Sequence, residues 1–200
     1  MRSLHRQVII VTGASAGIGE ATARRLVANG ANVVLAARRQ QRLELLKQEL
    51  ESIPVAVKAN GDRQRVLAVP TDITQKEDRK RLVAETIKTY GRIDGLINNA
   101  GFGVRGPVEL MPIEKIRENF ETNLFSLMAL TQQVIPIMRE RRQGRIVNVG
   151  SVAGKIARPF SSIYDATKHA LEAINDGLRG ELSLVGVQVV LSEPGYILTE

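Results

Sequence analysis

The chain has 200 residues and a net charge of +7, with 44% hydrophobic residues, 4% aromatic residues and no cysteine. This length fits one domain, residues 1–200, with a single substantial core. The lack of cysteine excludes disulfides, thiolate metal sites and a cysteine nucleophile. The apolar run near the N-terminus is too short for a secretory signal or a membrane span, so we expect a soluble, cytoplasmic protein.

The positive charge raises the question of nucleic acid binding. Aromatic residues are scarce, and the arginines are spread over several predicted helix surfaces, whereas a nucleic acid site combines a basic face with interleaved aromatic residues. A solvated basic surface with one local patch for an anionic cofactor explains the charge better. We therefore expect no nucleic acid partner.

Apolar runs alternate with amphipathic stretches along the chain, which is typical of a parallel sheet covered by helices. The predicted strands are Val8–Val11, Asn32–Ala37, Val66–Val69, Ile93–Ile97, Arg145–Val149 and Val187–Leu191. The predicted helices are Glu20–Asn29, Gln40–Leu50, Gln75–Tyr90, Ile113–Arg142 and Ser162–Leu184. This order predicts a three-layer α/β fold: a Rossmann-like, doubly wound parallel sheet with helices on both faces and a ligand crevice at the carboxyl ends of the strands.

One segment fits this pattern less well. Ser52–Arg65 is long for a link between a helix and a strand, and it contains the turn signal Asn60-Gly61. A small surface hairpin would explain it, but its role stays unassigned.

The first predicted strand runs into a glycine-rich turn, Thr12-Gly13-Ala14-Ser15-Ala16-Gly17-Ile18-Gly19. Its three glycines lack the Cβ atoms that would keep a ligand away from the backbone, and they permit positive φ. The helix that follows points free N–H groups and the positive end of its dipole at the turn, which suits a phosphate or pyrophosphate. The spacing differs from the commonest dinucleotide fingerprint, and a turn that merely needs small residues is the alternative.

Arg38 and Arg39 follow the second predicted strand. An Asp or Glu at this position would accept from a ribose 2′-hydroxyl, whereas arginine would bind a 2′-phosphate through charge-assisted hydrogen bonds. The pair therefore predicts NADP(H) in preference to NAD(H). The alternative is that both arginines merely begin a solvated helix.

Polar residues also follow the third and fourth strands. After the third, the carboxylate of Asp72, next to Ile73, could accept from an adenine amino group or cap a turn or the coming helix. After the fourth, Asn99 and Ala100 lie in Asn98-Asn99-Ala100-Gly101. Small and amide residues there suit a backbone close to a cofactor, although an ordinary turn uses the same residues.

Three later residues are candidates for the chemistry. Ser151 follows the fifth strand, and Tyr164 and Lys168 lie four apart on a predicted helix, so they share one face. A free tyrosine, with a pKa near ~10, is a poor base at neutral pH, but a close ammonium stabilises its phenolate. Tyr164 could then give a proton to a carbonyl oxygen or take one from an alcohol, while Ser151 donates a hydrogen bond to the same oxygen.

The motif Tyr-x-x-x-Lys occurs by chance on many surface helices. It becomes significant here because Ser151 and the glycine turn occur in the same chain. Together, Thr12–Gly19, Asn98–Gly101, Asn123, Ser151, Tyr164, Lys168 and Pro194-Gly195 resemble the short-chain dehydrogenase/reductase superfamily, in its single-domain branch, from about Val8 to the end of the chain.

This resemblance implies a set of cofactor-binding residues. Gly13, Ser15, Gly17, Ile18 and Gly19 would line the pyrophosphate and the adenosine ribose, Asp72 and Ile73 the adenine, and Asn99 and Ala100 the adenosine side and the central sheet. Lys168 would bind the nicotinamide ribose beside Tyr164, and Ile197 and Thr199, after Pro194 and Gly195, would contact the carboxamide. Asn123 would kink its helix and hold a water that relays protons from Lys168; without the resemblance it would be a solvated or helix-packing amide.

The resemblance also implies a function: an NADP(H)-dependent oxidoreductase that interconverts a carbonyl and an alcohol on a small-molecule substrate, without a metal, as a homodimer or homotetramer. The stretch from Leu178 to Tyr196 is similar to members that act on retinol-like and steroid-like alcohols, which points to an apolar substrate, but related bacterial reductases have broad specificity.

Two alternatives stay open. One is a sugar-nucleotide epimerase or dehydratase of the extended branch, whose extra domain does not fit this length. The other is a non-catalytic NADP(H)-binding regulatory or scaffold protein. Family members continue past the position of Glu200 with a substrate-covering helical loop and a last strand, so we expect this chain either to lack both or to have an open substrate side.

Overall fold

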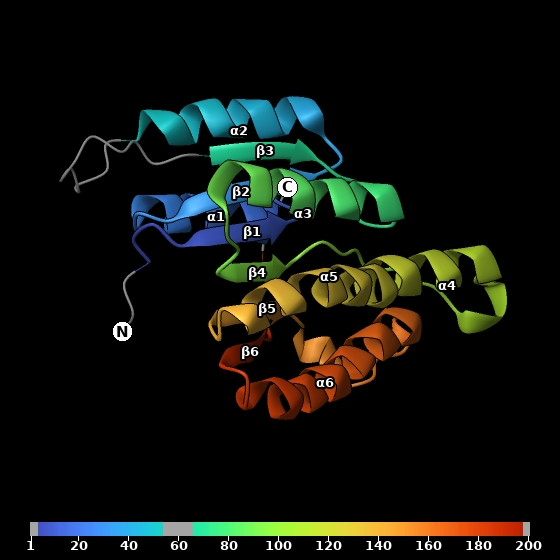
Figure 1. Ribbon diagram of the computed structural model, residues 1–200. Helices are drawn as coiled ribbons and strands as arrows, with labels where there is room; N and C mark the ends of the chain where they lie inside the picture. Colours follow the sequence, from blue (N-terminus) through green and yellow to red (C-terminus); the bar gives the residue numbers. More distant parts are fainter. Residues whose placement is uncertain (1–3, 54–65, 198–200) are drawn as a thin grey trace. The chain divides into compact units, whose positions relative to one another are not determined.

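The computed structural model describes residues 4–53 and 66–197 of the chain (Figure 1). Its strands are β1 Val8–Thr12, β2 Asn32–Ala37, β3 Val66–Pro70, β4 Gly95–Asn98, β5 Gly144–Val149 and β6 Val187–Ser192. Its α-helices are α1 Gly17–Ala28, α2 Gln40–Ser52, α3 Lys76–Tyr90, α4 Ile113–Phe120, α5 Ser126–Glu140 and α6 Ser162–Ser183. Short helical turns are η1 Val108–Leu110, η2 Glu121–Phe125 and η3 Val152–Gly154.

The chain divides into two compact units, of which the first ends at Asn99 and the second spans Ala100–Ile197. In the first unit, β1 pairs in parallel with both β2 and β4, and β2 pairs in parallel with β3. The strand order there is β3-β2-β1-β4, so the chain builds outward from β1 and then returns to its other side. This reversal next to β1 is the doubly wound arrangement, and such a reversal opens a crevice at the carboxyl ends of the strands.

The core of the first unit explains why its strands read as continuous apolar runs. One face of β1 and β2, with Ile9, Val11, Val33 and Leu35, packs in one cluster with buried residues of α1 and α2, and Figure 1 shows α2 lying along β3. The residues that alternate with them are buried as well, since Ile10 is 0% exposed. Both faces of this sheet are therefore covered, as parallel sheets require.

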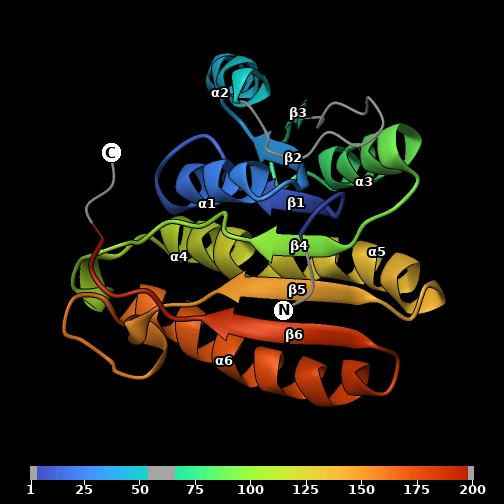
Figure 2. The same ribbon diagram turned by 90° about the vertical axis from the view of Figure 1, so that its left-hand side faces the viewer.

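The second unit has the parallel pair β5–β6 with α6 packed on β6 (Figure 2). A smaller cluster joins Leu124 and Leu127 to Leu171 of α6, with Leu191 of β6 packed against it. Helix α6 contributes Leu171 to this cluster and also carries Tyr164 and Lys168. The packing of the cluster therefore fixes the position of α6 and, with it, of those two side chains.

The helix predicted over Ile113–Arg142 is present, but it is not regular. The structure has α4, then the π-helical turn η2, then α5, which ends at Glu140. A π-turn inserts one residue into the helical repeat, and the side chain of Asn123, in that turn, bonds Phe102 and Thr167 instead of solvent. The apolar periodicity on either side of η2 does not reveal such an insertion.

The other predicted elements differ only at their ends. The first helix begins at Gly17 rather than Glu20, and the fourth strand begins at Gly95 rather than Ile93. The hairpin predicted within Ser52–Arg65 falls mostly on residues 54–65, which lie outside the described residues. Within residues 4–53 and 66–197, no helix combines the length and the apolar character needed to cross a membrane.

The turn before β6 gives a test of the backbone. Gly186 has φ +76°, and a Cβ there would collide with the backbone carbonyl of Arg142. We expect Gly186→Ala to lower the free energy of unfolding by at least about 2 kcal/mol, measured by urea denaturation. Gly180, in α6, has nothing within 4 Å of a built Cβ, so Gly180→Ala should instead gain up to about 1 kcal/mol. Equal effects of the two changes would refute this account.

Candidate functional site

The glycine turn lies in the first unit, between β1 and α1. Gly13 and Gly17 have φ of +65° and +56°, conformations that favour glycine. A Cβ on Gly19 would collide with the carbonyl of Gly13 and with the amide of Asn99. The predicted turn therefore needs glycine at all three positions for reasons of backbone geometry, and α1 begins within it.

Asn99 ties the end of β4 to this turn. Its side-chain amide donates to the carbonyls of Thr12 and Gly13, at 3.0 and 3.3 Å, and its backbone N–H donates to Thr12 Oγ1 at 3.0 Å. The Thr12 hydroxyl in turn donates to the Ile97 carbonyl at 3.2 Å. The side chain of Asn99 therefore shapes the loop, and its neighbour Ala100 is half-buried.

Arg39 is joined to the glycine turn, which the sequence did not indicate. Its Nε donates to Ser15 Oγ at 3.0 Å, and Ser15 is only 6% exposed. Arg38 and Arg39 are both exposed and precede the first residue of α2. The structure thus anchors one guanidinium at the rim of the turn and leaves the other in solvent beside it.

Asp72 has a local structural role. Its Oδ1 accepts from the backbone N–H of Thr74 at 3.0 Å and from the Thr74 hydroxyl at 2.7 Å, which is a turn stabilised by an Asp side chain. Ile73 is 8% exposed. The turn-capping alternative is therefore observed, and a contact of Asp72 with adenine stays a prediction.

In the second unit, Lys168 is buried beside Tyr164 on α6. Lys168 is 8% exposed, its Nζ lies 5.7 Å from the centroid of the Tyr164 ring, and it donates to the Val149 carbonyl at 2.8 Å. Burial lowers the pKa of Lys168 to about 8. An ammonium with one carbonyl acceptor and two further hydrogens can bind ligand hydroxyls and favours negative charge nearby.

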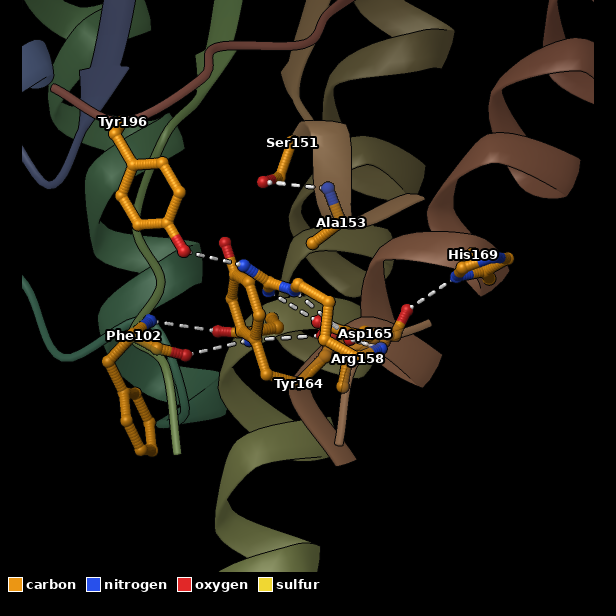
Figure 3. A network of polar contacts seen from close by, with 10 residues as sticks. Phe102, Ser151, Ala153, Arg158, Tyr164, Asp165, His169 and Tyr196 are labelled. Atoms are coloured by element: carbon orange, nitrogen blue, oxygen red, sulfur yellow. Dashed lines mark hydrogen bonds and ion pairs between the residues drawn. The ribbon is translucent and has the colours of Figure 1, made fainter. Parts of the chain in front are cut away.

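Ser151 stands at the end of β5 with a free donor. Its Oγ accepts from the backbone N–H of Ala153 at 3.1 Å (Figure 3), and this bond caps η3. Among the described residues, the Ser151 hydroxyl hydrogen has no acceptor, and the half-buried Tyr164 hydroxyl has no hydrogen-bond partner. Both hydroxyl groups can therefore bond an added oxygen atom.

The amide of Asn123 is occupied on both sides. Its Oδ1 accepts from the Phe102 N–H at 3.0 Å, and its Nδ2 donates to the Phe102 carbonyl at 2.9 Å and to Thr167 Oγ1 at 3.2 Å. Thr167 Oγ1 donates to the Tyr164 carbonyl at 2.7 Å. The structure thus links Asn123 to the helical turn of Tyr164 through protein atoms, and the expected water relay stays a prediction.

A second asparagine that the sequence analysis missed supports the same contact. Asn119 is 0% exposed and donates from Nδ2 to the Phe102 carbonyl at 2.8 Å, one helical turn before Asn123. Its Oδ1 is buried without a partner in the described chain. The spacing of the two asparagines, four residues apart in one predicted helix, was the signal that could have revealed it.

The sequence also gave no weight to Arg158, Asp165 and Tyr196. Asp165 is 1% exposed and accepts from the Arg158 backbone N–H at 2.7 Å, from Nε at 3.3 Å and from a terminal guanidinium nitrogen at 2.6 Å. Burial opposes ionisation of Asp165, but these bonds outweigh it and lower its pKa, while they raise that of Arg158. Figure 3 shows Arg158 between Asp165 and the Tyr196 hydroxyl, to which it donates at 3.3 Å.

The segment after β6 carries the last predicted residues. The Pro194 carbonyl accepts from the Val152 N–H at 3.3 Å, Gly195 is exposed, and Ile197 is 54% exposed. Thr199 lies outside the described residues. Among the residues that are described, no group of three His, Cys, Asp or Glu side chains could hold a metal ion.

The predicted site residues therefore fall into two sets, each assembled within its own unit. The glycine turn with Ser15, Arg38, Arg39, Asp72, Ile73 and Asn99 belongs to the first unit. Ala100, Asn123, Ser151, Tyr164, Lys168 and the residues after β6 that the structure describes belong to the second. The first set can bind phosphate groups, and the second can move a proton at an oxygen.

The sequence matches a known protein family. Residues 7–200 match the family model described as short chain dehydrogenase. The chain is 38% identical to the mouse protein named dehydrogenase/reductase SDR family member 7B, over 98% of this chain and 59% of that protein. It is 35% identical to an oxidoreductase of Staphylococcus saprophyticus, over 100% of this chain and 78% of that protein. The chain spans about three fifths of the length of the mouse protein and of a similar protein from Anopheles gambiae.

Solved structures of similar proteins have the same fold. A short-chain dehydrogenase from Streptomyces avermitilis is 36% identical with a TM-score of 0.86, over 96% of this chain and 66% of that one. A 3-ketoacyl-(acyl-carrier-protein) reductase from Brucella melitensis, complexed with NADH, is 30% identical with a TM-score of 0.89, over 98% of this chain and 78% of that one. The predicted Rossmann-like α/β fold, with parallel strands flanked by helices, is confirmed.

The lowered pKa of Lys168 predicts a pH-dependent stability. Between pH about 8 and 10.5, the unfolded chain holds the Lys168 proton and the folded protein does not, so stability must rise with pH in this window. We expect the free energy of unfolding of the wild type, minus that of Lys168→Met, to increase between these pH values in urea titrations.

Lys88→Met, which removes a lysine that is 78% exposed on α3, is the control, and it should run parallel to the wild type. If the Lys168→Met curve also ran parallel to the wild-type curve, the burial of this charge would have no energetic consequence.

Proposed function

The chain belongs to the short-chain dehydrogenase family, and from that premise we propose that it is an NADP(H)-dependent oxidoreductase that interconverts a carbonyl and an alcohol. The observation that carries this proposal is the arrangement in the second unit: a buried Lys168 ammonium 5.7 Å from the Tyr164 ring, and free hydroxyl donors on Tyr164 and Ser151. This set matches proton transfer at a single oxygen atom.

The residues of the first unit fit a nicotinamide dinucleotide. The glycine turn brings free backbone N–H groups at the start of α1 to the position where a pyrophosphate would bind. Arg39, held by Ser15, supplies a guanidinium at the end of β2, where a carboxylate would select a ribose 2′-hydroxyl. A fork of N–H donors there suits the dianionic 2′-phosphate, which supports NADP(H) over NAD(H).

Two similar structures hold a nicotinamide dinucleotide: the Brucella reductase is complexed with NADH, and a xylitol dehydrogenase that is 28% identical, with a TM-score of 0.89, is bound to NAD⁺. NADH and NAD⁺ are two redox forms of the same dinucleotide, so these structures support a nicotinamide cofactor and do not bear on a 2′-phosphate. The proposed preference in this chain rests on Arg38 and Arg39 alone.

In the proposed reaction, hydride transfer belongs to the cofactor and proton transfer belongs to the protein. The bound nicotinamide supplies the hydride in reduction and accepts it in oxidation. Tyr164 donates its phenolic proton to the carbonyl oxygen during reduction and removes a proton from the alcohol during oxidation. Lys168 stabilises the phenolate by its charge, and Ser151 donates a hydrogen bond to the same oxygen as negative charge develops on it.

Asn123 has a positioning role in this mechanism. With Phe102 and Thr167 as partners, it holds the helical turn that carries Tyr164 against the segment that follows β4. Homodimer or homotetramer assembly, a cytoplasmic location and an apolar substrate remain predictions that the resemblance supports. A non-catalytic NADP(H)-binding protein is the alternative outcome of the first experiment below.

The first experiment tests Tyr164. NADPH oxidation is followed by absorbance with a panel of ketones and aldehydes, for the wild type, Tyr164→Phe and the control Tyr90→Phe. We expect turnover with NADPH in the wild type and a loss of at least about a hundredfold in kcat for Tyr164→Phe, because the proton donor is gone, with cofactor binding retained. Tyr90→Phe should keep its activity. Equal rates in the wild type and Tyr164→Phe would remove Tyr164 from the mechanism, and no turnover in any protein would favour the non-catalytic alternative.

The second experiment tests cofactor choice. We expect Arg39→Gln and Arg38→Gln each to raise the KM for NADPH by about tenfold to a hundredfold, the value of one or two charge-assisted hydrogen bonds, and to change the KM for NADH by less than twofold. Lys47→Gln, which likewise replaces a cationic side chain with a neutral amide, lies on α2. It should change neither the KM for NADPH nor the KM for NADH. An unchanged ratio in both arginine variants would mean that other residues bind the 2′-phosphate.

A further inference from the structure

The loop between Ser151 and Tyr164 is closed by a buried ion pair. Asp165, in the first turn of α6, is 1% exposed, and its carboxylate accepts one backbone and two side-chain bonds from Arg158. The Ser161 N–H donates to the Arg158 carbonyl at 3.1 Å, and the Asp165 N–H donates to the Ser161 carbonyl at 2.9 Å. Residues 158–165 thus form a closed ring of the chain that contains Tyr164.

The same loop is joined to the neighbouring segments of its unit. Arg158 donates to the Tyr196 hydroxyl, in the segment after β6, and the Gly106 N–H donates to the Phe160 carbonyl at 2.8 Å. Figure 3 shows Arg158 at the centre of this network, with Tyr164 beside Asp165 on the same helical turn. One guanidinium therefore connects the start of α6 with the segment that follows β6.

Two features of this loop are energetically costly. Phe160 has φ +62°, unusual for a residue with a bulky side chain, and its side chain is 64% exposed, so the backbone strain is not offset by burial of the ring. A buried ion pair also stabilises a fold no better than apolar residues of similar volume. Stability alone therefore does not account for this loop, and strained segments cluster at functional sites.

We propose that Arg158 is a positioning residue of the proposed reaction. By holding Asp165, it fixes the loop that separates Ser151 from Tyr164 and so sets how their two hydroxyl groups meet one substrate oxygen. Through Tyr196 it also holds the segment after β6. Arg158 itself touches no reacting atom, and its role rests on the proposed function.

The kinetic test compares Arg158→Gln, Asp165→Asn and the double variant with the wild type. We expect Arg158→Gln to lower kcat by about ten- to a hundredfold, as small misplacements of reacting groups do, with the KM for NADPH changed less than twofold. Because the two side chains act as one unit, the double variant should lose no more than the worse single variant. Arg179→Gln, which breaks an exposed pair with Asp176 on the same helix, is the matched control and should keep its kcat.

Two further variants separate positioning from folding. Arg158→Ala leaves a partly exposed space, since the Arg158 side chain is 25% exposed, so millimolar guanidinium should restore part of its kcat and should have no such effect on Asp165→Asn. Arg158→Lys keeps the charge without the fork and should have an intermediate kcat even if Arg158→Gln fails to fold. No rescue, together with a kcat of Arg158→Lys equal to that of the wild type, would overturn the proposal.

A readout without substrate keeps this inference separate from the proposed function. The chain has 3 tyrosines, so ¹³C-tyrosine NMR gives few resonances, and Tyr164→Phe assigns one of them. We expect the Tyr164 resonance to broaden or split in Arg158→Gln and to stay sharp in Arg179→Gln. If the wild type turned over no carbonyl, the proposed function would fail while this result still decided whether Arg158 positions Tyr164. An unchanged Tyr164 resonance in a folded Arg158→Gln would refute the inference.

Discussion

The burial of one positive charge is the constraint on which the second unit depends. Lys168 donates to the Val149 carbonyl at the end of β5 and lies next to the Tyr164 ring, without a carboxylate partner among the described residues. Such a charge is costly, and buried charges of this kind cluster at functional sites. The strand end, the helix face and the phenol are therefore parts of one electrostatic arrangement.

The two units contribute different chemistry, and each builds its share from short-range contacts. In the first unit, hydrogen bonds between Asn99 and Thr12 join the end of β4 to the end of β1 beside the glycine turn, and Ser15 accepts a hydrogen bond from Arg39. In the second, the amides of Asn119 and Asn123 fix the Phe102 peptide. Side chains that could have bonded water instead bond other groups of the protein, at the positions where a ligand is expected to bind.

Sequence reasoning was strongest where one residue type satisfies a backbone requirement. The glycines at 13, 17 and 19 and the apolar runs of the strands could be interpreted directly, because positive φ and double-sided burial restrict composition strongly. The spacing of Tyr164 and Lys168 was equally informative, since a helix places such a pair on one face.

The features that were missed depend on partners far apart in the chain or on unusual geometry. Nothing in the local pattern shows that Arg39 bonds Ser15 or that Asp165 lies buried against Arg158. An Asp in the first turn of a helix is ordinary, and an Arg before a Pro is a common loop residue. Only the folded backbone reveals that these side chains are partners.

The π-turn Glu121–Phe125 also bears on how this region can vary. Each residue of an α-helix rotates the chain by roughly 100°, so one residue more or less in η2 turns the buried Leu127 and Leu130 of α5 by about that angle relative to Asn119 and Asn123, which bond Phe102. Loss of a single residue there would straighten the helix and swing either the amides or the leucines away from their partners. In related chains, the length of this segment should therefore be less free to change than the identity of its exposed side chains.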